Sequence, residues 1–245
     1  MKKLLQILLL SLGLIGCSLI DKAELTSLTS PSDIQVNRIL ALDLSHAESL
    51  KEANKIMNPD VAASVVKELE ARNLQAENAI IEAENVVKFA EKVKVSDSNS
   101  DNQIKFIGSE INESKKVDFF DNYDYQDYFL RGWKDKNNGL IQHQLYLSLK
   151  YTSDNWRNYY SASFSNGSQV DIALISTDAV SCDTSGCNYT EIMELNLSDD
   201  FLRSNMEKGF SIHFNSKSSD KRVSIKPNKI TISSDYIKGY LKVAK

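Results

Sequence analysis

The sequence contains little proline and little glycine, with three and nine of its 245 residues respectively. This composition excludes collagen-like repeats and most low-complexity disorder, which need far more of both residues. The formal net charge is only −4, and lysine and arginine form no cluster of the kind that binds nucleic acid. The sequence therefore predicts a folded chain with no nucleic-acid partner.

Motifs that carry catalytic chemistry are also missing, since no G-x-S-x-G, H-E-x-x-H, P-loop or G-x-G-x-x-G pattern occurs. Ser64-Val65-Val66-Lys67 and Ser153-Asp154-Asn155 match two motifs of penicillin-binding-protein-like acylases, but the third, a Lys-Thr/Ser-Gly strand, is absent. Neither His143 nor His213 has an acid and a nucleophile nearby in the sequence that would indicate a catalytic triad. The three histidines and three cysteines do not show the spacing of a zinc site. We expect no cofactor, no metal and no catalytic residue that the sequence can name.

An apolar run, Leu4–Ile15, follows the two positive charges of Lys2 and Lys3 at the N-terminus. The run is too short for a transmembrane helix, which needs about 20 apolar residues, so a secretory signal fits better. It closes with Leu14-Ile15-Gly16-Cys17, which resembles the lipobox of bacterial lipoproteins. In that family the cysteine receives a diacylglycerol thioether and becomes the mature N-terminus.

The resemblance implies a lipid on Cys17, a signal peptide over residues 1–16, and a protein anchored to a membrane of the bacterial cell envelope. Ser18 follows the cysteine, where enteric-type sorting places an aspartate in lipoproteins of the inner membrane. We therefore expect a Gram-negative outer membrane, facing the periplasm or the surface. The alternative is an ordinary signal with an unmodified cysteine.

Cysteine is scarce, and beyond Cys17 only Cys182 and Cys187 remain. Disulfides persist outside the cytosol, and Gly186 permits the tight turn that so short a loop needs. A zinc site wants four ligands, and a C-x-x-C redox pair has another spacing. The sequence predicts a structural disulfide between Cys182 and Cys187.

The mature chain divides by composition and periodicity into four parts. Residues 17–33 form a lipidated polar tether, residues 34–95 a helical segment, residues 96–103 a linker, and residues 104–245 a β-rich domain. The expected fold class is α+β, with the linker assigned by its Ser, Asp and Asn content.

The helical segment shows two start signals. Ser45 and Glu48 have the spacing of a capping box, and Asn58-Pro59 begins a long helix that no glycine or proline interrupts before Lys94. Apolar residues recur along this helix at three- and four-residue steps, with Asn73 among them. The stripe favours packing within the chain, and the alternative is self-association through residues 60–94 as a coiled coil.

The β-rich domain shows a period of two. Alternate residues of one strand share an apolar face: Ile141, His143, Leu145, Leu147, Leu149 and Tyr151. An Asn-Gly turn joins that strand to the preceding run as a hairpin, and we expect further strands at Asn158–Phe164, Gln169–Ser176, Thr190–Leu197, Gly209–Asn215 and Arg222–Ile225. Ser198 begins a short helix that ends at Gly209, and Ser234 begins a terminal helix. These signals predict a mainly antiparallel sandwich or half-open barrel with two short helices.

Aromatic residues gather in Asp118–Trp133 and in the later "NWRNYY" stretch. Tyr and Trp offer large amphipathic contact areas, which suit protein interfaces and sugar stacking, although rings in a β domain are often simply core. The candidate binding patch comprises Tyr123, Tyr125, Tyr128, Trp133, Trp156, Tyr159 and Tyr160. The sequence thus favours a lipid-anchored, non-catalytic binding or structural module for an envelope protein or glycan; the alternative is an envelope hydrolase whose site only the fold assembles.

Overall fold

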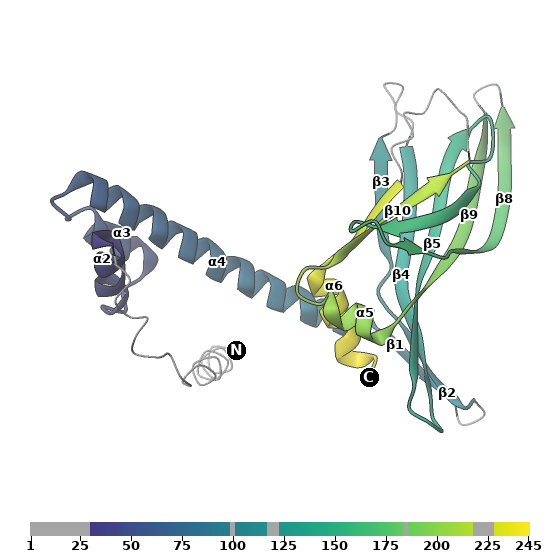
Figure 1. Cartoon of the computed structure of the whole chain (residues 1–245), viewed down its shortest axis with the longest axis horizontal. Coiled ribbons are helices and arrows are strands. Elements are labelled where there is room, and N and C mark those ends of the chain that lie inside the picture. The colour runs from purple at the N-terminus through teal and green to yellow at the C-terminus, as the bar shows by residue number, and fades with distance from the viewer. Residues whose placement is uncertain (1–29, 99–100, 117–122, 184–185, 218–227) are drawn as a thin grey trace. The chain divides into compact units, whose positions relative to one another are not determined.

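The computed structural model describes residues 30–98, 101–116, 123–183, 186–217 and 228–245 (Figure 1). Cys17, the signal peptide and the predicted strand Arg222–Ile225 lie outside these residues. No helix in the described ranges is both long enough and apolar enough to cross a membrane. The chain forms two compact units, Met1–Asn78 and Ala79–Lys245, and the boundary between them falls inside one long helix.

The first unit is helical, with α2 (Pro31–Leu40), α3 (His46–Ala53) and the beginning of α4 (Pro59–Lys92). The predicted start signals are confirmed. Ser45 and Glu48 form a capping box at α3, and Asn58 Oδ1 accepts hydrogen bonds from the N–H groups of Asp60 and Val61 at 3.0 and 3.2 Å. The unit has a small core of its own, made of Val36, Ile39, Ala53, Val65 and Leu69.

Helix α2 corrects the predicted extent of the tether, because residues 31–33 are its first turn. Ser30 accepts a hydrogen bond from the N–H of Asp33, whose carboxylate accepts one from the N–H of Ser30. Pro31 occupies the first helical position, where its missing N–H costs nothing. These capping signals are present in the sequence, but the helix that follows has only ten residues, which is too short for a clear helical period.

The second unit contains a seven-stranded antiparallel sheet (Figure 1). Its main path runs β1-β2-β4-β5-β9-β8, and β3 pairs with the first half of β4 while β2 pairs with the second half. The strands are β1 (Lys94–Asp97), β2 (Gln103–Ile107), β3 (Ile111–Lys116), β4 (Tyr123–Asp135), β5 (Ile141–Ser153), β8 (Ala173–Asp183) and β9 (Gly186–Leu197).

A smaller, four-stranded antiparallel sheet packs against it in the order β11-β10-β6-β7. Its strands are β6 (Tyr159–Phe164), β7 (Gln169–Val170), β10 (Phe210–Ser216) and β11 (Asn228–Ile232). One core joins the two sheets, with fully buried side chains from both, among them Leu145, Leu147, Met193, Ile212 and Ile230. The predicted α+β class with a sandwich-like, mainly antiparallel β domain is confirmed.

The predicted hairpin between β4 and β5 is also confirmed. Gly139 has φ +73° in its turn, and the N–H of Asp135 donates to the carbonyl of Leu140 at 2.9 Å. The inward row of β5 from His143 to Tyr151 is buried as the alternation predicts. Register across the pair follows from the turn, with Lys134 opposite Ile141.

Other predicted elements differ in detail. The expected strand Gln169–Ser176 is two strands, β7 and β8, separated at residues 171–172. Strand β1 takes residues 94–95 from the expected helical segment and residues 96–97 from the expected linker, and β2 begins at Gln103, the last residue of that linker. The short helix α5 (Asp199–Ser204) begins after Ser198 as predicted but ends before Gly209. Strands β1, β2, β3 and β11 were not predicted, because each is short and mixes charged with apolar residues, so its alternation is weak.

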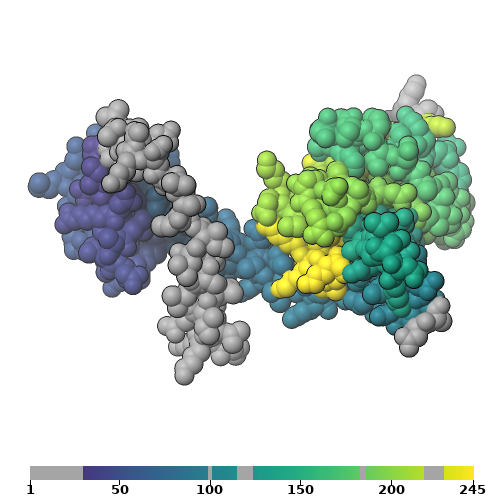
Figure 2. All heavy atoms as spheres, turned by 60° about the horizontal axis from the view of Figure 1, so that its bottom comes forward, coloured from purple at the N-terminus to yellow at the C-terminus, as the bar shows by residue number. Residues whose placement is uncertain are grey.

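The terminal helix α6 (Ser234–Val243) packs on the Ala79–Lys92 part of α4 within the second unit. Lys238 Nζ donates to Glu82 at 2.9 Å and to Glu207 at 2.8 Å, and the Phe89 and Tyr236 rings meet edge to face at 5.0 Å. Figure 2 shows α6 in yellow against the blue end of α4 and the light-green α5 region. The contact covers only one side of α4, since Ile80 and Ile81 are 59% and 55% exposed. Self-association through residues 60–94 stays a prediction.

Gly239 lets the two helices approach closely, so we expect Gly239→Val to destabilise the second unit. A Cβ at this position would lie 2.6 Å from Phe89 Cβ and 2.8 Å from the carbonyl oxygen of Val86. Overpacking of this kind costs about 1–3 kcal/mol. Urea unfolding followed by tryptophan fluorescence reports on this unit, because both tryptophans, Trp133 and Trp156, belong to it. Lys242→Ala, at an exposed position of the same helix, is the control, and its free energy of unfolding should stay within about 0.5 kcal/mol of the parent. An unchanged unfolding midpoint for Gly239→Val would contradict the close packing.

Candidate functional site

The structure distributes the seven predicted patch residues over three environments. Tyr128 and Tyr159 are buried in the core, at 2% and 6% exposure. Trp156 packs on Tyr189 with 4.4 Å between ring centroids, while Tyr160 is exposed on β6. Tyr125 and Trp133 share one face of β4, and Tyr123 begins that strand without a described side chain. The seven rings therefore do not form one continuous surface.

Strand β4 separates its residues strictly by face. Asp124, Gln126, Tyr128 and Leu130 point into the core and are buried. The alternate set, here called the outer face of β4, consists of Tyr125, Asp127, Phe129, Arg131 and Trp133. Tyr125 is 52% exposed and the other four are partly exposed. The outer face is thus a row of rings interrupted by one acid and one guanidinium.

Arg131 is held between aromatic rings on this face. Its Cζ lies 5.2 Å from the Trp133 ring centroid and 5.0 Å from that of Tyr146 on β5, within the range of cation–π attraction. Its Nε donates to Gln144 Oε1 at 3.0 Å, and its Nη2 forms an ion pair with Glu194 on β9. Because residues of three strands restrain it, the guanidinium is held in one position on this face.

Phe129 extends the row toward a hollow in the surface. Its ring stacks on that of Tyr146, with centroids 4.8 Å apart and planes inclined by 25°. It also lines a depression of about 590 Å³ together with Ile107, Ser109 and Asn112. The outer face therefore combines a flat aromatic row with a polar-rimmed depression at one side.

Asp127 places a negative charge on the same row. Its carboxylate accepts hydrogen bonds from Lys150 Nζ at 2.6 Å and from Asn112 Nδ2 at 2.7 Å. Partial burial alone would raise the pKa of Asp127, but these two donors outweigh burial and hold its pKa below the usual range. The outer face consequently keeps a fixed carboxylate at neutral pH.

A second polar cluster lies inside the domain. Arg157 and Asp124 form a two-pronged ion pair, with nitrogen–oxygen distances of 2.5 and 2.9 Å, and both side chains are about 5% exposed or less. Burial alone would lower the pKa of Arg157, but the hydrogen bond to Asp124 outweighs it and raises that pKa. The guanidinium also lies over the Tyr151 ring at 4.1 Å. Burial raises the pKa of Tyr159 beside it to about 12.

Glu191 completes this cluster by holding the segment that leads from β5 to β6. It accepts hydrogen bonds from the N–H groups of Asn158 and Tyr159, both at 3.1 Å, and from the Tyr151 hydroxyl. Asn158 has φ +51°, a left-handed conformation that asparagine tolerates better than most residues. Every partner of Glu191 here is a structural group of the chain, so the cluster fits a structural role.

Two side chains of the second unit, Gln126 and Ser216, have buried polar atoms without a hydrogen-bond partner among the described residues. Gln126 is fully buried, and neither its Nε2 nor its Oε1 has a hydrogen-bond partner among the described residues. The buried hydroxyl of Ser216 is in the same condition. Unpaired buried amides are uncommon and destabilising, and ordered water often satisfies them.

His143 forms the arrangement most similar to a catalytic dyad. Its Nε2 lies 3.2 Å from Asp199 Oδ1 and its Nδ1 lies 3.0 Å from the Tyr240 hydroxyl. The imidazole is 1% exposed, as is Tyr240, so no substrate could reach either ring in this conformation. The predicted assignment of His143 to the core is confirmed.

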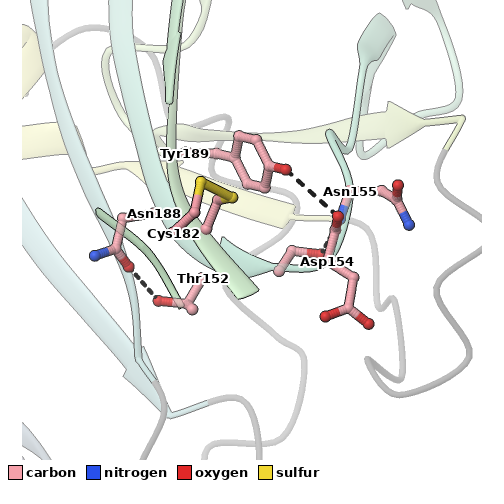
Figure 3. The surroundings of a disulfide bond; sticks show 8 residues. Thr152, Asp154, Asn155, Cys182, Asn188 and Tyr189 are labelled. Atoms are coloured by element: carbon pink, nitrogen blue, oxygen red, sulfur yellow. Dashed lines mark hydrogen bonds between the residues drawn. A yellow bond between two sulfur atoms is a disulfide. The ribbon is translucent and has the colours of Figure 1, made fainter. Parts of the chain in front are cut away.

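The predicted disulfide is confirmed as well. Cys182 at the end of β8 and Cys187 at the start of β9 are bonded across the turn between these strands (Figure 3). Gly186 adopts φ +123°, and a Cβ there would lie 2.5 Å from the carbonyl oxygen of Ser153. The bond therefore closes a turn in which glycine is required.

The described ranges contain no group of three or more His, Cys, Asp or Glu side chains arranged to hold a metal ion. Comparison of the chain with protein-family models, with curated proteins and with solved structures found no match.

Sequence reasoning missed Arg131, Tyr146 and Glu194 as members of the surface. The alternation of β4 already placed Arg131 and Trp133 on one face, and the β5 alternation placed Tyr146 opposite Leu145 and Leu147. That signal could have found the first two. Glu194 could not be found, because its pairing depends on β9 lying next to β5.

The buried His143 predicts a pH dependence of stability. Burial lowers its pKa below 6.5, and the hydrogen bond to Asp199 only partly opposes this. The unfolded chain therefore binds a proton that the folded chain does not, so the imidazole's contribution is present above about pH 6.5 and is lost as the pH falls toward the folded pKa. We expect the free energy of unfolding to fall by up to about 1.4 kcal/mol per pH unit in that window.

Urea titrations between pH 7.5 and pH 5 measure this slope. His143→Gln should flatten it, whereas His213→Gln, which leaves the buried imidazole in place, should keep it. Asp199, whose pKa is lowered by Arg203 and by His143, titrates below this window. An unchanged slope in His143→Gln would show that the imidazole is not the responsible group.

Proposed function

We propose that the protein is a lipid-anchored binding module of the bacterial cell envelope, attached through Cys17 and binding a protein or glycan through the outer face of β4. The observation that carries the binding role is the restrained Arg131 between Trp133 and Tyr146. Trp, Tyr and Arg are the residues most enriched at the energetic centres of protein interfaces. Their placement on a partly exposed sheet face favours a protein partner over a glycan.

The anchor rests on the lipobox-like Leu14-Ile15-Gly16-Cys17. A single acyl chain holds a protein only marginally, whereas two or three make release negligible. The Cys182–Cys187 bond is compatible with an oxidising compartment, and Ser18 favours the outer membrane. Together they support a site of action in a Gram-negative periplasm or at its surface.

The alternative, an envelope hydrolase, needs converging polar groups that a substrate can reach. The His143 imidazole and the Arg157–Asp124 pair are buried. Asp199, the carboxylate beside His143, is 32% exposed, but it is bonded to both His143 and Arg203. The carboxylates around His143 and around Arg157 accept hydrogen bonds from the chain's own groups. This burial supports a structural role for both clusters and a non-catalytic role for the domain.

Photocrosslinking in intact cells tests the binding surface. We expect a photoreactive residue at Tyr125 or Trp133 of the full-length protein to form a discrete adduct, because both lie on the outer face. Tyr160, exposed at 54% on the other sheet, is the matched control and should form none. Arg131→Ala should weaken the Tyr125 adduct at least about fivefold, since it removes a restrained interface residue.

Protease and glycosidase sensitivity then identify the chemistry of the adduct. A protease-sensitive adduct supports the favoured protein partner, and a glycan adduct supports the other. Equal adducts from Tyr125 and Tyr160, or none from the outer face, would contradict the proposed surface.

Cys17→Ser tests the anchor separately. Cells fed an alkyne-tagged fatty acid should label the parent protein and not the Cys17→Ser variant, and the variant should keep its uncleaved signal. Cys182→Ser with Cys187→Ser is the control for cysteine loss and should still be labelled. Labelling of the Cys17→Ser protein would rule out this residue as the lipid site.

A further inference from the structure

Strand β8 is the last strand of the seven-stranded sheet, and among the described residues it pairs only with β9 (Figure 1). It is eleven residues long, about twice the usual strand length. Residues 173–182 are exposed on both faces, including Leu174 at 53%, Ile175 at 47% and Val180 at 52%. Its free edge is a row of backbone donors and acceptors that an extended chain can satisfy.

Natural edge strands are usually protected, and β8 has little protection. Lysine, arginine and proline, which normally block such edges, are absent from "ALISTDAVSCD". The strand is irregular only where its register against β9 shifts, between Leu174 and Ser176 and between Val180 and Asp183. The stretch from Ser176 to Val180 is regular, and its one charge is Asp178.

We infer that β8 pairs antiparallel with β8 of a second copy of this chain, around a two-fold axis at Thr177. In an antiparallel pair, two residues that face each other must lie on the same face of the continued sheet. A two-fold axis meets this condition only where it passes midway between the two copies of one residue. An axis at Asp178 would set the two carboxylates directly opposite each other, which is destabilising.

The axis at Thr177 avoids that repulsion and pairs compatible side chains. Thr177 faces the partner's Thr177, and Asp178 faces the partner's Ser176, whose hydroxyl can donate to the carboxylate. Ile175, the residue that the register shift leaves without a partner in β9, comes next along the strand and lies nearest the partner's Ala179, where it covers apolar surface that is otherwise exposed. The two sheets would become one continuous sheet, and the free edge of each copy would be satisfied by the other.

Cysteine crosslinking of the full-length protein in intact cells tests this register. Thr177→Cys should give a covalent dimer with a short bismaleimide, because the two added thiols face each other across the axis. Ala179→Cys alone should give several-fold less, since its two copies lie about 13 Å apart along the strands. Cells that express Ala179→Cys together with Ile175→Cys should restore the dimer.

Thr177→Lys is the disrupting variant, because it sets two like charges opposite each other at the axis. Introduced into both chains of the Ile175→Cys and Ala179→Cys pair, it should reduce the dimer at least about fivefold. The parent chain, which has no added cysteine, measures background, and the bismaleimide leaves the Cys182–Cys187 bond intact.

The inference would be overturned by equal dimer yields from Thr177→Cys and Ala179→Cys alone, by a Thr177→Cys adduct with a different protein, or by a dimer that Thr177→Lys leaves unchanged. The exposed positions chosen here keep the core intact, so an absent dimer would also count against it. The outcome does not depend on what the outer face of β4 binds.

Discussion

The buried ion pair between Arg157 and Asp124 is the constraint on which the second unit depends. Arg157 lies in the segment that leaves the large sheet at β5 and enters the small sheet at β6, while Asp124 comes from β4. The backbone N–H of Arg157 donates to the Tyr151 hydroxyl at 2.8 Å, and that hydroxyl donates to Glu191 of β9. Because an unpaired buried charge is strongly destabilising, each of these strands can occupy only the position that satisfies the others. The relation between the two sheets is therefore set by polar contacts at one end and by apolar packing along the rest of the core.

The surfaces of the unit follow from this arrangement. Once Asp124, Gln126, Tyr128 and Leu130 face inward, the pleat of β4 obliges Phe129, Arg131 and Trp133 to face outward. Hydrogen bonding to β5 then brings Tyr146 beside Phe129, and β9 brings Glu194 to Arg131. At the other margin, β8 continues the sheet beyond the area that the small sheet covers, which leaves its residues exposed. The aromatic row and the open edge thus belong to one sheet. The inner face of this sheet is buried in the core, whereas its outer face and its edge strand β8 are exposed.

Local signals explain which elements could be predicted. Each of the confirmed helix starts and turns depends on residues within four positions of one another, so it can be recognised in the sequence. They are Ser45 with Glu48, Asn58-Pro59, Ser198 and Asn138-Gly139. The long period of α4 and the alternation of β5 are strong because each extends over many residues. Strands β1, β2 and β3 are held by their partners rather than by their own composition, and residues 171–172 interrupt the β7–β8 run without any glycine or proline. No local rule could place those boundaries.

The sequence by itself determined the lipobox-like N-terminus, the pairing of the two remaining cysteines, the α+β class and the inward direction of His143. Tertiary structure alone decided which rings are core and which are surface. Tyr128 and Tyr125 lie in the same strand and have similar chemistry, but only the position of the second sheet buries the first and leaves the second exposed. It also decided that Arg157, rather than solvent, would partner Asp124, since these residues are distant in the sequence. The physical reason is that burial and ion pairing depend on what lies across the core, and a linear pattern records only neighbours along the chain.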